Sequence, residues 1–422
     1  MTSRSTPAIT RPGGGRTRLT TLVAILAVTQ TVGYGILYYT FSVLISPIAH
    51  DLHTSTARVT AAITISVLAG SAAAIPVGRW LDRHGGRALM ATGSLLGVAA
   101  VVAWSQVHSL VQLYFVFVFI GAASAMSLYE AAFAVLIATS GPERRASAML
   151  QVTIVAGFAS SIFLPLTGWL ATEWGWRTTL LTLAGLLAAT AIPGHLIAVP
   201  SRRVHREHTS SQPGTRPADA LRDRGFWLLG GAFVLHAAAV SSVGVLLVTS
   251  LQHLGHTAKT AATVAGLLGV LSVTGRLTTT AVARRHGMAS VTAILFGVQA
   301  VGVAALPYLG RNLAAAGACV TAFGLGFGVA TIARPAIVAA RYGTARYATI
   351  SSALVLPITL AKAAAPLTAA LLSVRWAMTA AAAGCLGAAV LLSWSARPGE
   401  ARTARRRSSP GVDPQVGSAT LR

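Results

Sequence analysis

The sequence predicts an all-α membrane protein whose twelve transmembrane helices form two pseudo-symmetric six-helix bundles. Of its 422 residues, 54% are hydrophobic and only 10% are charged. The mean hydropathy is +0.66, which is more apolar surface than a water-soluble globule can bury. Twelve segments are long enough to cross about 30 Å of hydrocarbon at about 1.5 Å per helical residue. One long polar stretch divides the segments six and six.

The twelve apolar segments make up most of the chain, and as helices they satisfy their own backbone hydrogen bonds within lipid. In chain order they are 20–47, 58–81, 88–107, 110–139, 147–172, 178–199, 226–252, 259–283, 288–309, 312–340, 347–373 and 376–395. The eight tryptophans support these limits, because each lies at or near a segment end, where an amphipathic indole prefers the membrane interface.

The basic residues are divided unequally between the two sides of the membrane. Of the 33 lysines and arginines, 25 precede, follow or connect segments on one side, five lie on the other and three lie within segments. By the positive-inside rule, both tails, 1–19 and 396–422, are cytoplasmic, and we expect a multi-pass protein of the inner (plasma) membrane. Arginines beside the inner face explain the net charge of +23 without a nucleic-acid partner.

The polar stretch 200–225 is rich in Arg, His, Ser and Pro and reads as a cytoplasmic linker. It separates a bundle at 20–199 from a bundle at 226–395. The two halves also echo each other, because Asp-Arg-His-Gly at 82–85 recurs as Arg-Arg-His-Gly at 284–287. Duplication of six spans is typical of transporters, in which two similar bundles enclose a site at their interface.

Four ionisable residues interrupt the apolar segments: Glu130, Arg276, Arg334 and Lys362. A charge at such depth is costly, so we expect these side chains to face a water-filled cavity or one another. Three cations against one carboxylate suit an anionic substrate. Arg can bind a carboxylate through two parallel hydrogen bonds, and Lys offers a compact positive charge.

Each of these residues also has a structural interpretation. Glu130 and Arg334 occupy matching places in the two halves, and they can form a salt bridge between the bundles. Arg276 can extend toward the inner headgroups, whereas Lys362 is too deep to do so easily.

Tyr34 and Tyr38 belong to a polar-aromatic stripe in the first segment. They can line a cavity and donate hydroxyl hydrogen bonds to a carboxylate, or they can face lipid or the core.

The loop between the second and third segments reads GRWLDRHGGR, and it resembles the GxxxDRxGxR signature of the major facilitator superfamily. The matching residues are Gly78, Asp82, Arg83, Gly85 and Arg87. A tight loop needs glycine at Gly85. The resemblance, which runs from the first span to the twelfth, implies that Asp82 faces a helix N-terminus and an arginine.

By the same resemblance, Glu143 and Arg144 after the fourth segment complete a charge cluster that latches one conformation. The alternative is that they are ordinary loop charges.

Within that superfamily, the pattern is most similar to the branch of monocarboxylate transporters and oxalate/formate exchangers. Thr31–Gly35 resembles a glycine-aromatic-glycine signature that lacks the acidic residue expected near Thr31. Arg276 is similar to that branch's functional arginine, with Ser272 where an aspartate is expected. Lys362 is similar to the exchangers' lysine. Drug exporters would carry an arginine where this chain has Phe117.

The sequence therefore predicts a secondary active transporter that moves a small organic anion, most simply a carboxylate, by alternating access with proton coupling or exchange. The alternatives are a proton-coupled exporter of drugs or natural products and, more distantly, a transport-dead membrane sensor. We expect the bilayer, a small-molecule substrate and protons as partners. No metal-ligand spacing, phosphate-binding loop or nucleophile motif occurs in the sequence, so we expect no enzyme activity, metal or cofactor.

Overall fold

A computed structural model describes residues 14–201 and 214–395. Parts of the predicted tails and linker, namely 1–13, 202–213 and 396–422, lie outside the described residues. The described part is helical except for turns and a single β-bridge between Gly214 and Gly343.

The first six spans are built from eight α-helices and one short π-helix. These are α1 (Gly14–Tyr34), η1 (Gly35–Tyr39), α2 (Thr40–Asp51), α3 (Thr56–His84), α4 (Gly86–Ser105), α5 (Leu110–Ser127), α6 (Tyr129–Thr139), α7 (Pro142–Ala156) and α8 (Ala159–Ala198). The second six spans follow a short helix, α10 (Pro217–Arg222). They are built from α11 (Arg224–His253), α12 (Ala258–His286), α13 (Met288–Leu309), α14 (Leu313–Phe327), α15 (Ala330–Tyr342), α16 (Tyr347–Ser352), α17 (Val355–Ala370) and α18 (Val374–Ser395).

Eleven helical stretches in the described residues are long and apolar enough to cross a membrane, and one of them makes two crossings. That stretch, Pro142–Ala198, has 57 residues, whereas one crossing needs about 20. Inside it, Gly175 leaves the helical conformation at φ 73° and ψ 162°, which favours glycine. The chain therefore turns back at Gly175, and the predicted twelve-span, all-α fold is confirmed.

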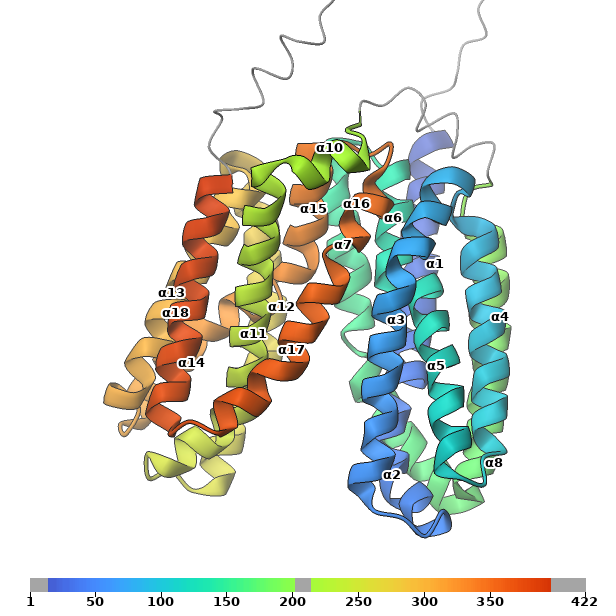
Figure 1. Ribbon diagram of the computed structural model, residues 1–422, viewed down its shortest axis with the longest axis horizontal. Helices are drawn as coiled ribbons and strands as arrows, with labels where there is room; N and C mark the ends of the chain where they lie inside the picture. The colour runs from blue at the N-terminus through green and yellow to red at the C-terminus, as the bar shows by residue number, and fades with distance from the viewer. Residues whose placement is uncertain (1–13, 202–213, 396–422) are drawn as a thin grey trace, which may run out of the picture.

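The helices form two bundles that stand side by side (Figure 1). One contains α1 to α8 and the other α11 to α18. The first residues of α1, the last of α18 and the short helix α10 lie at the same end of the molecule, at the top of Figure 1. We call this the linker end and the other the opposite end.

The buried apolar residues show where the bundles are joined. At the linker end one cluster contains residues of both bundles, among them Leu136 of α6 and Val338 of α15. At the opposite end each bundle has its own cluster, around Trp104 in the first and around Phe323 in the second. In the described residues, therefore, the shared core closes the space between the bundles at the linker end only.

Several spans are interrupted near their middle. Leu128 separates α5 from α6 with an extended backbone (φ −90°, ψ −159°), and Gly328 and Val329 separate α14 from α15. These two breaks lie in the fourth and tenth spans, which correspond in the two halves. Interrupted helices are tolerated at membrane depth where they border a cavity or are buried in protein, so the breaks mark the region of the site.

Candidate functional site

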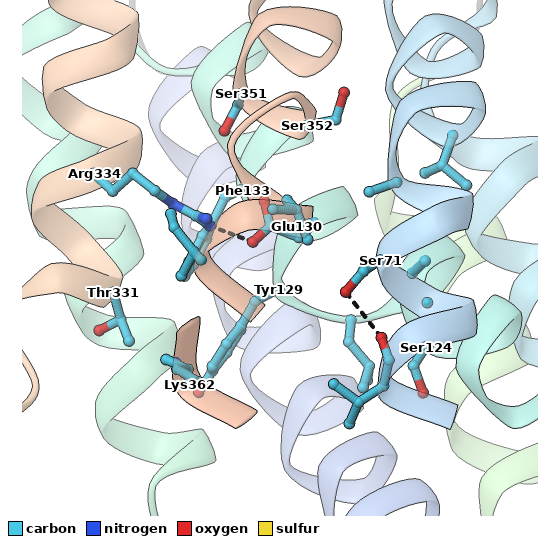
Figure 2. A pocket seen from close by; sticks show the side chains of 18 of the residues that line it. Ser71, Ser124, Tyr129, Glu130, Phe133, Thr331, Arg334, Ser351, Ser352 and Lys362 are labelled. Atoms are coloured by element: carbon cyan, nitrogen blue, oxygen red, sulfur yellow. Dashed lines mark hydrogen bonds and ion pairs between the residues drawn. The ribbon is translucent and has the colours of Figure 1, made fainter. Parts of the chain in front are cut away.

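A cavity of about 560 Å³ lies between the two bundles, with walls from α1, η1, α3, α5 and α6 on one side and α11 and α14 to α17 on the other. Its size is in the range typical of small-molecule sites. Among the described residues, the formally charged side chains of its wall are Glu130, Arg334 and Lys362. Three of the four predicted intramembrane charges thus meet in one cavity (Figure 2).

Glu130 and Arg334 form an ion pair across the cavity, as Figure 2 shows. Glu130 lies in the first turn of α6, directly after the break at Leu128, and Arg334 lies on α15 of the other bundle. The Arg334 side chain is 14% exposed and the Glu130 side chain 35%. The pair therefore joins the bundles while its carboxylate stays accessible from the cavity.

Lys362 lies on α17 and is exposed to the cavity. Its backbone carbonyl accepts a hydrogen bond from Ser241 Oγ at 2.7 Å. Its ammonium group makes no hydrogen bond or ion pair with any residue in the described ranges. Because Glu130 and Arg334 neutralise each other, Lys362 leaves the described wall with one uncompensated positive charge.

Arg276 is held apart from these three charges and is not part of the described cavity wall. Its Nε donates to the carbonyl of Gly328 at 3.1 Å, at the break between α14 and α15. Its Nη1 donates to the carbonyl of Thr153 at 3.4 Å, on α7 of the other bundle. Arg276 thus contacts backbone carbonyls between the bundles and does not extend toward the headgroups.

Tyr34 and Tyr38 both line the cavity, as one of the two sequence interpretations predicts. Tyr34 packs against Tyr129, with ring centroids 4.5 Å apart, and Tyr129 stacks on Phe133 at 5.0 Å. Tyr38 is 46% exposed and meets Tyr39 edge to face. The sequence reasoning missed Tyr129 and Phe133, although they flank Glu130 at helical spacing.

The predicted loop motif meets the other bundle through Asp82. Its carboxylate accepts hydrogen bonds from the backbone N–H groups of Ala348 (3.1 Å) and Thr349 (2.8 Å) in the first turn of α16. A Cβ at Gly78 would lie only 2.5 Å from the carbonyl oxygen of Ala348, so this close approach requires glycine. The helix N-terminus implied by the resemblance is thus placed beside Asp82.

The remaining motif residues lie around the loop. Gly85 ends α3 at φ 78°, and Gly287, its counterpart in the repeat, also has φ 78°. Arg87 Nε donates to the carbonyl of Val199 at 2.6 Å. Arg83 is exposed. The matching glycines support the repeat inferred from the sequence.

Glu143 and Arg144 are exposed at the start of α7, and no hydrogen bond or ion pair of their side chains is found within the described ranges. Their neighbour Arg145 instead donates from Nε to the carbonyl of Ser140 at 3.0 Å. The latch role of Glu143 and Arg144 therefore stays a prediction.

Among the described residues, no group of three His, Cys, Asp or Glu side chains is arranged to hold a metal ion.

Comparison with known proteins identifies the fold. The family model of the Major Facilitator Superfamily matches residues 26–366. The Escherichia coli fucose:proton symporter FucP superposes with a TM-score of 0.68 at 13% identity, over 89% of this chain and 98% of that chain. The human organic anion transporter MFSD10 gives 0.65 at 18% identity, over 90% and 100%.

A bacterial homologue of the iron transporter ferroportin, in an outward-facing state, gives a TM-score of 0.69 at 17% identity, over 90% of this chain and 100% of that chain. At these identities the likeness shows the fold alone. No curated protein sequence matches the chain. The family match over most of the sequence, on a fold of twelve spans, shows that the chain belongs to the major facilitator superfamily and is a secondary membrane transporter, not an enzyme.

Proposed function

We propose that the protein carries a small organic anion with a carboxylate group across the membrane by alternating access, coupled to protons or in exchange for a second anion. The observation that carries this proposal is the uncompensated ammonium group of Lys362 in a cavity whose two other charges pair with each other. An unpaired charge is expensive at membrane depth, and an anionic ligand compensates it.

Alternating access requires the shared core at the linker end to part. Besides apolar packing, polar contacts that cross between the bundles in the described residues include Asp82 to α16, Glu130 to Arg334 and Arg276 to Thr153. We propose that these contacts act together as the latch of this conformation. If the linker end is cytoplasmic, as the arginine distribution predicts, the conformation faces outward.

The ion pair offers a way to couple substrate to movement. A carboxylate entering the cavity competes with Glu130 for Arg334, and a proton on Glu130 releases Arg334 outright. Either event weakens a contact that joins the bundles. The alternative, a purely structural salt bridge, predicts that any pair of matched neutral side chains restores function as well as stability.

Export of a cationic or neutral compound is the second candidate, favoured by the many apolar and aromatic side chains in the cavity wall. In that case Glu130 alone would carry the proton, and Lys362 would tolerate replacement. The free ammonium group favours the anion proposal.

The test is uptake of radiolabelled carboxylates by purified protein in liposomes, with a pH gradient or a counter-substrate inside. We expect accumulation that falls at least about tenfold in Lys362→Gln, because a charge-assisted contact is worth about 1.5 to 3 kcal/mol. The matched control, Arg311→Gln, removes an equal charge from the exposed surface at the opposite end and should leave uptake unchanged. If no carboxylate accumulates under any gradient, the anion proposal fails.

A further inference from the structure

We infer that the transported anion is a monovalent aryl carboxylate, whose carboxylate meets Lys362 and whose ring lies against the tyrosines of the first bundle. This inference rests on the proposed function and names the class of substrate that the same cavity takes. The inference predicts that the cavity binds aryl acids in preference to dicarboxylates and to one- or two-carbon acids.

The charge of the described wall favours a single carboxylate. Arg334 already pairs with Glu130, and Arg276 donates to carbonyls outside the wall. Lys362 is then the one cation in the described wall that a ligand can meet without displacing a partner. A dicarboxylate would bring its second charge into the cavity without a counterion, which is unfavourable where water is scarce.

The hydroxyl groups of the wall supply acceptors and few donors. Ser71 donates to the carbonyl of Val67 at 2.8 Å, and Ser124 donates to that of Ile120 at 2.7 Å. Thr331 donates to the carbonyl of Gly328, at the break between α14 and α15, at 2.6 Å. Because each hydroxyl has one hydrogen, these groups cannot also donate to a carboxylate. The anion is left with Lys362, the tyrosine hydroxyls and Ser351, whose Oγ has no hydrogen-bond partner among the described residues.

The aromatic side chains provide the surface for a ring. Five of them keep part of their area open in the cavity wall, namely Tyr34, Tyr38, Tyr39, Tyr129 and Phe327. Tyr129 is held in place from behind by the stacked ring of Phe133, which is 3% exposed. Aromatic rings prefer offset-stacked or edge-to-face partners, and fixed rings offer such partners without losing much freedom.

The size of the cavity agrees with a ligand that contains a ring. A volume of about 560 Å³ is typical of sites that bury most of a drug-sized ligand. A one- or two-carbon acid would fill little of it and leave the aromatic wall in contact with water. An aryl acid covers that wall while its carboxylate still meets Lys362.

Calorimetry on the purified full-length protein tests the inference with phenylacetate, cyclohexylacetate, acetate and succinate. We expect phenylacetate to bind about tenfold or more tighter than acetate or succinate, because burial of its ring adds apolar area. It should bind about three- to tenfold tighter than cyclohexylacetate, which has similar bulk but no π-face.

Two variants test separately the contact of the ligand's ring with the aromatic wall and the contact of its carboxylate with Lys362. Tyr129→Leu should remove the preference for phenylacetate over cyclohexylacetate, and Lys362→Gln should weaken both acids by the same factor. Tyr38→Leu repeats the ring test at a more exposed position, in case Tyr129→Leu does not fold. Phe115→Leu, an exposed aromatic on the outer face of α5, is the control and should change nothing.

The outcomes distinguish the two proposals. Tightest binding of succinate or acetate, or equal binding of phenylacetate and cyclohexylacetate, overturns the aryl inference and leaves carboxylate transport intact. Failure of every carboxylate to bind, together with absence of uptake into liposomes, overturns both.

Discussion

The two ends of the molecule differ in what their contacts join. At the opposite end the polar contacts lie within one bundle, since Arg177 on α8 pairs with Asp51 at the end of α2 (2.6 Å) and donates to the carbonyl of Val107 (2.8 Å). At the linker end Asp82 reaches across to the other bundle, and in the cavity Glu130 does the same. The apolar clusters show the same division. The difference suggests that each bundle moves as a body and that the linker-end interface is the part that opens.

The largest effect should come from Gly78, where α3 lies close against the backbone of α16. Gly78→Val would drive side-chain atoms into the Ala348 carbonyl, so the shared core could not close, at a cost of about 3 kcal/mol. We expect transport to fall at least about tenfold, with the protein still folded. Uptake into liposomes measures it.

Gly185→Val is the matched control, because a Cβ at this exposed position on α8 meets nothing within 4 Å. Unimpaired uptake in Gly78→Val would show that α3 and α16 need not meet during the transport cycle.

A smaller effect is expected from the ion pair that crosses the cavity. Glu130→Gln leaves Arg334 without its partner and should cost about 1 to 3 kcal/mol of stability, less than a fully buried pair because the carboxylate is partly exposed. The double variant Glu130→Gln/Arg334→Gln should regain most of that stability. Thermal unfolding in detergent measures both.

Uptake by the same double variant decides between the two roles of the pair. If the pair couples substrate to movement, stability returns and transport does not. Recovery of both would leave the pair as a structural salt bridge only.

Asp82 should have a more modest effect. Asp82→Asn keeps one acceptor oxygen but loses the charge that two N–H groups of α16 now meet, which is worth about 1 kcal/mol. The linker end should open more often, by a factor of about five. Labelling of a Ser351→Cys probe in the cavity wall by a water-soluble maleimide, in a background without the two native cysteines, should quicken correspondingly from the linker side. Unchanged labelling would remove Asp82 from the latch.

The smallest effect concerns Asp223, whose carboxylate contacts residues of its own bundle, the second, at the linker end. Burial raises the pKa of its carboxyl, but hydrogen bonds from Tyr342 and from the N–H of Gly225, with the charge of Arg341, outweigh burial and hold that pKa below its usual range. Since the folded-state pKa is the lower one, Asp223 stabilises the fold above its unfolded pKa of about 3.9. That stability is lost as the pH falls through the folded pKa.

Asp223→Asn should therefore lower the melting temperature at pH 6 and have little effect well below pH 4. Asp219→Asn on the exposed face of α10 is the control. An equal loss at both pH values would mean that the carboxylate charge does not matter there.

Much of the fold could be predicted because lipid imposes simple rules on a sequence. Apolar length predicted the spans, and the repeat gave Glu130 and Arg334 matching places in the two halves. One connection differs from the prediction. Between the fifth and sixth spans the sequence predicted a short loop, whereas in the structure the chain turns at Gly175 and is helical on both sides of it.

The site could be predicted only in part. Depth alone grouped Arg276 with the cavity charges, whereas its guanidinium donates to the carbonyls of Gly328 and Thr153, the first of which lies at the break between α14 and α15. A break of this kind depends on packing between helices and leaves little trace in composition. Tyr129 was missed because an aromatic residue in an apolar segment is more often part of a core.

The most direct test of the comparison is a set of spin-label distances in lipid nanodiscs, using cysteines at exposed positions in a background without native cysteines. One labelled pair, at positions Arg83 and Arg284, measures the distance across the linker end. A second pair, at Arg58 and Arg311, measures the distance across the opposite end, and a third, at Arg58 and Glu173, measures a distance within one bundle. When a transported carboxylate is added, we predict that the linker-end distance lengthens and the opposite-end distance shortens while the distance within the bundle stays constant. A changed distance within the bundle, or a linker end that never opens during transport, would contradict the account.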